Sequence, residues 1–124
     1  MIRFRDKDFR CSMEVTLELV GAKWKVFVLW QLAQNGVMRF NALSRIHPDL
    51  TSKMLSQQLK ELERDELVVR RSYNQVPPKV EYSLSTWGQS LVPVLEQMCQ
   101  WGERYLEKHE QTAATPCARA AAGQ

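Results

Sequence analysis

The chain has 124 residues, 44% of them hydrophobic and 25% charged, which suits one globular domain with a modest core. No apolar run approaches the roughly 18 to 20 residues that span a bilayer, and the N-terminus lacks the apolar stretch of a secretory signal, so we expect a cytoplasmic protein with no membrane partner. The net charge is +3, with positive charge in excess over residues 1–80 and negative charge over residues 81–124, as expected if one side faces a polyanion.

The cysteine and histidine content does not indicate a metal site. The three cysteines stand far apart and there are two histidines, so we expect reduced thiols, no metal and no cofactor. The sequence has no glycine-rich phosphate loop and no Gly-x-Ser-x-Gly elbow. We therefore do not expect an enzyme.

The first third of the chain predicts an arm and two helices. Residues 1–10 alternate charge with isolated apolar residues and predict a flexible or loosely docked arm. A short helix over 12–20 fits, with Ser12 as its N-cap and Gly21 at its end. The second helix, 23–34, has apolar residues on all sides, which is typical of a helix at the centre of a core.

The middle of the chain predicts two helices joined by a turn. Residues 38–39 could form a very short strand, and 40–46 form a third helix. Pro48 disfavours helical geometry in the residue before it, so 47–50 should be a turn. Thr51 is a suitable N-cap for a fourth helix that reaches about residue 65.

The last part predicts a hairpin and a long helix. Residues 67–73 are rich in β-branched side chains and 80–84 alternate in polarity, while the linker between them holds two prolines. Ser85 should cap a helix to about residue 108, with apolar residues at three- and four-residue steps. Beyond it the periodicity is lost, which predicts a disordered tail.

The predicted fold class is mainly α with a small β-hairpin wing, a winged helix-turn-helix with a long C-terminal dimerisation helix. The domain should cover 11–109, between an N-terminal arm at 1–10 and a disordered tail at 110–124. The apolar last helix belongs to a chain too small to bury all of it, which favours a homodimer.

Helical periodicity divides the fourth helix into two faces. At about 100° per residue, Leu55, Leu59 and Leu62 share one side. Cations and an amide lie on the opposite side, where they could neutralise phosphates or pair with bases in a major groove. A solvated surface is the alternative reading of such a face, but the preceding turn and the following wing favour DNA.

Residues near the start of a recognition helix reach deepest into the groove. We therefore expect base contacts from Thr51, Ser52, Lys53 and Gln57, with further DNA contacts from Ser56, Lys60, Arg64 and Arg39. Arg71 and Lys79 on the wing could reach phosphates or the minor groove, although a plain surface hairpin fits the wing equally well.

Several motifs together resemble one family. They are Cys-Ser-Met-Glu at 11–14, Gly-Ala-Lys-Trp-Lys at 21–25, Arg-Phe-Asn-Ala-Leu at 39–43, Lys-Met-Leu-Ser-Gln-Gln-Leu-Lys-Glu-Leu at 53–62 and Val-Pro-Pro-Lys-Val-Glu-Tyr-Ser-Leu at 76–84. This combination resembles the HxlR-type regulators, a winged helix group related in architecture to the MarR-like proteins. The resemblance covers about residues 11–108, with small departures at Ala22 and Trp87. It implies a homodimeric transcriptional regulator, which we expect to be a repressor, that binds an inverted-repeat operator in double-stranded DNA.

The resemblance also implies a candidate sensor. Some members of the family sense electrophiles or oxidants through a cysteine just before the first helix, and Cys11 occupies that position. Arg10 and the helix N-terminus would favour the reactive thiolate, whereas Glu14 opposes it. The effector would be a small electrophile or oxidant, and an ordinary unreactive thiol is the alternative.

The sequence also bears on two other winged helix functions. A metal-sensing repressor is disfavoured because no two thiols or imidazoles have ligand spacing. A winged helix used only for protein contacts remains the main alternative. Binding to random duplex with a steep negative salt dependence would distinguish a DNA-binding protein from it.

Overall fold

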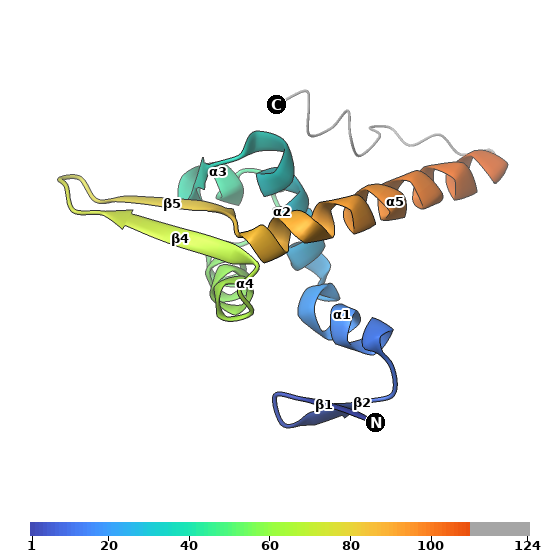
Figure 1. Ribbon diagram of the computed structural model, residues 1–124. Coiled ribbons are helices and arrows are strands. Elements are labelled where there is room, and N and C mark those ends of the chain that lie inside the picture. Colours follow the sequence, from blue (N-terminus) through green and yellow to red (C-terminus); the bar gives the residue numbers. More distant parts are fainter. Residues whose placement is uncertain (110–124) are drawn as a thin grey trace.

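The computed structural model describes residues 1–109, and the tail expected at 110–124 lies outside the described residues. In chain order the elements are β1 (Ile2–Phe4), β2 (Lys7–Phe9), α1 (Ser12–Val20), α2 (Lys23–Asn35), β3 (Met38–Arg39), α3 (Phe40–Ser44), α4 (Ser52–Arg64), β4 (Val68–Tyr73), β5 (Lys79–Leu84) and α5 (Thr86–Lys108) (Figure 1). Among residues 1–109, no helix combines the length and apolarity needed to cross a bilayer. This order of helices and strands is that of a winged helix-turn-helix, as the sequence predicts.

The central helix is α2, which packs against α4, α5 and β5. Val28 and Leu29 on it are fully buried, and the neighbouring elements contribute buried leucines and Tyr82 to the same cluster. The expectation of a helix buried on nearly all sides is confirmed, with Phe27 as an exception at 39% exposure. The helix ends at Gly36, whose φ of 79° lies in the left-handed region that favours glycine.

The helix-turn-helix consists of α3, the turn after it and α4. The helix α3 ends at Ser44, two residues earlier than expected, and Leu43 and Leu50 are buried on either side of the turn. The Thr51 side chain accepts a hydrogen bond from the backbone N–H of Met54 at 3.1 Å, so the predicted N-cap of α4 is confirmed.

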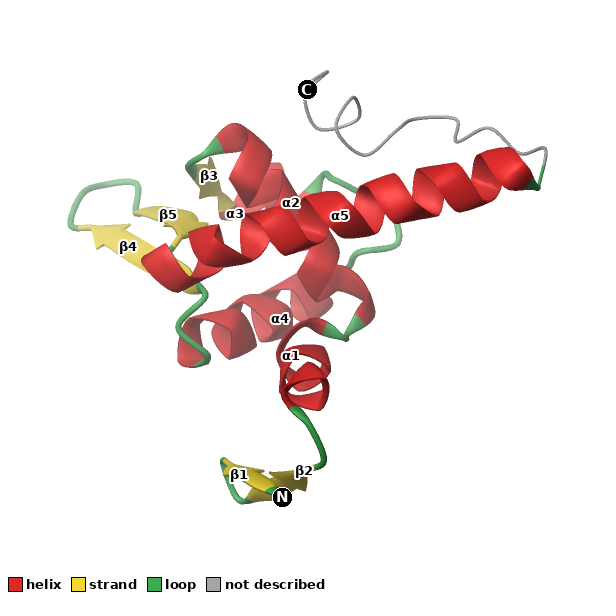
Figure 2. Ribbon diagram, turned by 45° about the vertical axis from the view of Figure 1, so that its right-hand side comes forward, coloured by secondary structure: helices red, strands yellow, loops and turns green. Residues whose placement is uncertain are grey.

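The wing is an antiparallel sheet of three strands in the order β3-β5-β4. The strand β3 pairs with β5 through Met38 opposite Tyr82 and Arg39 opposite Glu81. The β4–β5 hairpin extends well beyond the helices, and its loop forms one end of the molecule (Figures 1 and 2). The short strand and the hairpin are therefore present as predicted.

The long helix α5 starts in close contact with the connection between α4 and β4. The Ser85 hydroxyl accepts from the N–H of Gly88 at 3.0 Å and donates to the carbonyl of Glu66 at 2.6 Å. A Cβ at Gly88 would lie 2.1 Å from the carbonyl oxygen of Leu67, so this contact requires glycine. The helix continues through Pro93, and its C-terminal half projects beyond the body (Figures 1 and 2).

The N-terminal residues form a hairpin, where we expected a flexible or loosely docked arm. β1 pairs with β2, so that Ile2 lies opposite Phe9, and Phe9 is 7% exposed. Arg5 and Asp6 form the turn with φ of 51° and 62°. Hairpin turns of this kind are usually built from Asn and Gly, so the sequence carried no recognisable turn signal.

Candidate nucleic-acid interface

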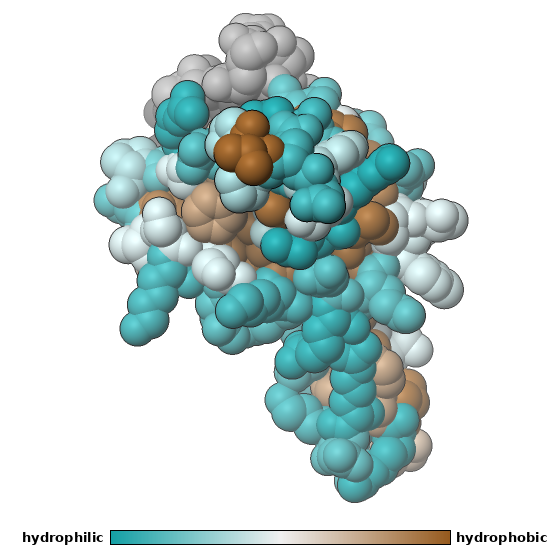
Figure 3. Space-filling model, turned by 90° about the vertical axis from the view of Figure 1, so that its left-hand side faces the viewer, coloured by the Kyte–Doolittle hydropathy of each residue, from teal (hydrophilic) through white to brown (hydrophobic). Residues whose placement is uncertain are grey.

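The two faces of α4 are separated as its periodicity predicts. Leu55 and Leu62 are fully buried and Leu59 is 2% exposed. The polar residues at the start and on the outer face are exposed, with Ser56 half-buried; they are Thr51, Ser52, Lys53, Ser56, Gln57 and Lys60. Viewed from the wing end, the molecular surface is mainly hydrophilic (Figure 3). A duplex could therefore contact the polar face of α4 without disturbing the leucines that pack in the core.

An ion pair with a buried cation lies behind the exposed face of α4. Lys25 on α2 has a side chain only 5% exposed, and its Nζ lies 2.6 Å from Oε1 of Glu61 on α4. The other carboxylate oxygen, Oε2, accepts from Nε2 of Gln57 at 2.7 Å. Hydrogen bonds from Lys25 and then Gln57 lower the pKa of Glu61 below its usual value. Glu61 is thus paired with a buried cation.

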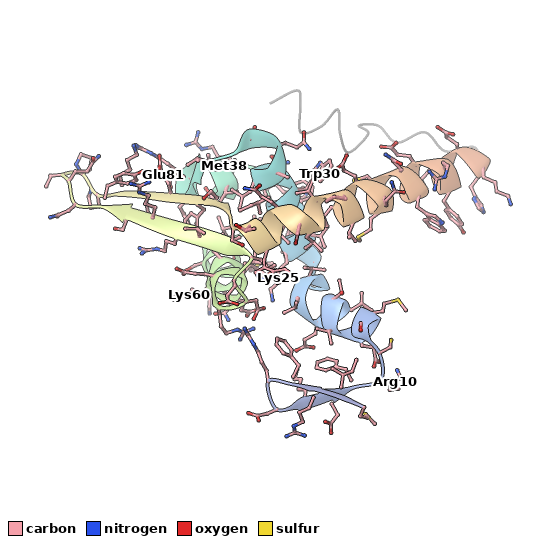
Figure 4. All side chains as sticks on the ribbon, in the orientation of Figure 1. Arg10, Lys25, Trp30, Met38, Lys60 and Glu81 are labelled. Atoms are coloured by element: carbon pink, nitrogen blue, oxygen red, sulfur yellow. The ribbon has the colours of Figure 1, made fainter. Side chains whose placement is uncertain are left out.

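The two faces of the wing carry different charged residues. Residues directly opposite on paired strands share a face, so Arg70 lies on the side of Tyr82, and Arg71 lies on the side of Glu81. Arg70 lines a hollow between the wing and α4 together with Ser56 and Lys60. Lys60 and Glu81 lie on opposite sides of the hairpin (Figure 4).

Arg70 is a candidate that our sequence-based selection omitted. Alternation along β4 places it on the same face as the buried Val68, and this face is the one that turns toward α4. The alternation of side chains along β4 could therefore have selected Arg70 from the sequence. It could do so only if the face of the wing that turns toward α4 were already known.

The opposite face of the wing holds a compact cluster around Glu81. Tyr73 donates its hydroxyl to Oε1 of Glu81 at 2.7 Å, and Nζ of Lys79 lies 3.4 Å from Oε2. Lys79 also lies 4.7 Å from the centre of the Tyr73 ring. The hydrogen bond from Tyr73 lowers the pKa of Glu81 and raises that of Tyr73. Arg39, opposite Glu81 in the sheet, lies beside this cluster.

The guanidinium of Arg64 is engaged within the protein. It donates to both oxygens of the Asp65 carboxylate, at 3.1 and 3.3 Å. Asp65 has a side chain only 2% exposed and also accepts from Arg5 of the N-terminal hairpin. The C-terminal end of α4 is thus joined to the hairpin.

Cys11 is exposed and is a free thiol. It occupies the N-cap position of α1, which we expected for Ser12, and it makes no side-chain capping bond. The neighbouring Arg10 is bound to Glu14, with Nη2 2.8 Å from Oε2, and hydrogen bonds from Arg10 lower the pKa of Glu14. The guanidinium of Arg10 is therefore paired with the carboxylate of Glu14. Cys99 on α5 is disulfide-bonded, so the expectation of a reduced thiol is wrong for that residue.

A stripe of exposed apolar side chains runs along the projecting half of α5. Its members are 47–61% exposed and recur at steps of three and four residues; they are Val94, Met98, Trp101 and Tyr105. The rings of Trp101 and Tyr105 stack with centroids 5.2 Å apart. Met13 and Leu17 on α1 are also exposed, at 68% and 59%. We call the four residues of α5 the α5 stripe.

Comparison with known proteins identifies the family. Residues 19–110 match the model of the HxlR-like helix-turn-helix family. An uncharacterised HTH-type transcriptional regulator of Bacillus subtilis, YkvN, is 54% identical over 102 residues, which cover 82% of this chain and 86% of that protein. These matches show the family.

Solved structures agree with this assignment. The redox regulator HypR in its reduced form is 45% identical with a TM-score of 0.76, over 81% of this chain and 98% of that one. The reduced transcriptional regulator YodB from B. subtilis is 32% identical with a TM-score of 0.68, over 81% and 98%. The similar proteins are regulators rather than enzymes. The chain thus belongs to the HxlR-like helix-turn-helix family and is a DNA-binding transcriptional regulator with a winged helix fold.

Proposed function

We propose that this protein is a homodimeric repressor that binds an inverted-repeat operator in double-stranded DNA. The observation that carries the proposal is the division of α4, whose leucines are buried while its cations, hydroxyls and Gln57 are exposed beside a projecting wing. A helix of this kind fits a major groove, and a wing beside it can follow the flanking backbone. A repressor would act by occupying the operator.

The candidate residues divide into base contacts and backbone contacts. The N-terminal half of α4 supplies the base contacts, from Thr51, Ser52, Lys53 and Gln57. Phosphate contacts come from α4 and the wing, and they are Arg39, Ser56, Lys60, Arg71 and Lys79, to which we add Arg70. Arg64 could join them through the N–H groups that Asp65 does not use, because the carboxylate accepts only from Nε and Nη2.

The α5 stripe supports a dimer. Four large apolar side chains are exposed on one side of a projecting helix. Monomeric proteins rarely expose a continuous apolar patch of this kind, and such patches usually mark an interface. A second copy offers the same stripe across a two-fold axis, so that both stripes are buried together. The two recognition helices would then lie about 34 Å apart on one face of B-DNA.

Cys11 is the proposed point of control by a small electrophile or oxidant. It is exposed and precedes α1, which lies between the N-terminal hairpin and the core. Among the similar structures, HypR is described as a redox regulator, in an oxidised and a reduced form. Modification of the Cys11 sulfur would add bulk at the N-terminus of α1 and so could reduce operator binding.

Selection from a pool of randomised duplexes, followed by sequencing, tests the proposal directly. We expect an enriched inverted repeat, with half-sites about one helical turn apart. Binding to random duplex should weaken steeply with salt, because several phosphates are neutralised. A winged helix that contacts only proteins would enrich no motif and would show little salt dependence, and that result would refute the proposal.

A further inference from the structure

Gln57 lies on the exposed face of α4, and its side chain is held in one orientation by the protein itself. Its Nε2 donates to Oε2 of Glu61 at 2.7 Å. An ionised carboxylate can only accept hydrogen bonds. If the amide turned over, its carbonyl oxygen would face the carboxylate oxygen, and that contact is repulsive. The amide of Gln57 therefore directs Nε2 toward Glu61.

Glu61 is itself anchored from behind. Its second oxygen, Oε1, lies 2.6 Å from Nζ of Lys25, whose side chain is 5% exposed. The Lys25 side chain comes from α2, the central helix of the core, and Figure 4 shows it between α2 and α4. A cation this deeply buried requires a counter-charge, so it keeps Glu61 ionised and in place. Each oxygen of the Glu61 carboxylate thus has one partner, Lys25 at Oε1 and Gln57 at Oε2.

This arrangement determines what Gln57 offers to a ligand in front of α4. With one N–H directed to Glu61, the carbonyl oxygen and the remaining N–H are left for an external partner. An acceptor and a donor side by side match the N6 amino group and N7 of adenine in the major groove. An unrestrained amide could present the two groups in either order, and a restrained one presents a single order.

We propose that Glu61, held by Lys25, is a positioning residue that orients the Gln57 amide to contact adenine at one position of each operator half-site. The inference rests on the proposed operator binding and adds two residues that do not themselves touch DNA. It distinguishes Glu61 from Glu63, a second carboxylate on α4, which makes no hydrogen bond or ion pair with Gln57 among residues 1–109.

The experiment is selection from a pool of randomised duplexes, carried out on the full chain and on four variants. Gln57→Ala identifies the base position that Gln57 contacts, where the adenine preference should fall roughly tenfold, as for the loss of one bidentate contact. Glu61→Ala should reduce the preference at that same position by a similar factor, because the amide is no longer oriented. All other positions of the motif should be unchanged. Glu63→Ala is the matched control and should retain the full motif.

Because Glu61→Ala leaves Lys25 buried without a counter-charge, that variant could unfold. The fourth variant, Lys25→Met with Glu61→Ala, removes both charges together and avoids an unpaired buried cation. It should fold, as shown by a cooperative unfolding transition, and should lose the adenine preference in the same way. The salt dependence of binding to random duplex should stay unchanged in it, because neither residue contacts a phosphate.

The outcomes separate this inference from the proposed function. If the unchanged protein enriches no motif, operator binding is wrong and the inference fails with it. If the motif appears but Gln57→Ala alters no position, only the inference fails. It also fails if the double variant keeps the adenine preference, or if it weakens all positions equally.

Discussion

Arg5 in the N-terminal hairpin donates a hydrogen bond to the carboxylate of Asp65, sixty positions later at the end of α4. Arg64 donates to the same carboxylate, and the Asp65 side chain is 2% exposed. The hairpin is therefore joined to the C-terminal end of the recognition helix. A second ion pair, Lys7 to Glu18 at 2.6 Å, joins the hairpin to α1.

Arg5→Ala should lower the free energy of unfolding by about 1 kcal/mol, because Asp65 keeps Arg64 as a partner while losing one charged hydrogen bond. Phe9→Ala should cost more, about 3 kcal/mol, because it empties a buried aromatic site. Chemical denaturation measures both. Arg3→Ala, which removes an exposed pair with Asp8, is the control and should change little. An equal effect of Arg3→Ala and Arg5→Ala would contradict this account.

Acid should weaken the Lys25–Glu61 pair. Hydrogen bonds from Lys25 and Gln57 lower the pKa of Glu61 from 4.5 in the folded protein. The folded state thus binds fewer protons than the unfolded chain between the two pKa values, and stability rises with pH across that window. The contribution is complete above about pH 4.5 and is lost as pH falls through the folded value.

Denaturation curves of the unchanged protein and of Glu61→Gln test this dependence. At neutral pH the variant should be about 3 kcal/mol less stable, because Lys25 loses its partner. Below pH 4.5 the difference should shrink. Glu63→Gln should follow the unchanged protein throughout, and a constant difference across the acid range would show that the ion pair is not responsible.

Arg70 and Arg71 should differ in their effect on DNA binding, because Arg70 lines the hollow beside α4 and Arg71 lies on the opposite face. Arg70→Ala should weaken binding to random duplex and reduce the slope of log affinity against log salt by about 1. Arg71→Ala should have the smaller effect. Titration at several salt concentrations measures both, and the reverse ranking would place the duplex on the other face of the wing.

The dimer should depend on the α5 stripe. Met98→Asp introduces a charge that a two-fold contact would bring close to its own copy, so the variant should sediment as a monomer at micromolar concentration. Val76→Asp, at a wing position that is 97% exposed, should remain a dimer. A monomeric unchanged protein at the same concentration would rule out the proposed assembly.

Cys11→Ser should abolish the release of operator DNA caused by a quinone, an aldehyde or diamide, because the substituted hydroxyl is a far weaker nucleophile than a thiolate. Operator binding before treatment should be unchanged, since the Cys11 side chain makes no capping bond. A gel-shift assay with and without the reagent, together with the mass of the treated protein, measures this. If the serine variant still releases DNA, another residue is the sensor.

The sequence alone determined the order of the elements from α1 to α5 and the two faces of α4. Both follow from local rules: Thr51 as a cap, the three leucines at helical spacing, and the alternation of Val80 and Tyr82 with polar residues. The exposed candidate residues of α4 followed from the same periodicity. These features need no knowledge of distant neighbours.

Tertiary structure alone decided which charges are free and which are paired. Two ion pairs depend on elements that meet only when the chain folds, and they are Lys25–Glu61 and Arg5–Asp65. The position of Arg70 on the side of the wing that faces α4 depends on folding in the same way. The N-terminal hairpin was missed because its turn is formed by Arg5 and Asp6 at positive φ, without the glycine that usually marks such a turn in a sequence. Periodicity indicates whether a side chain points outward, and packing determines what it meets there.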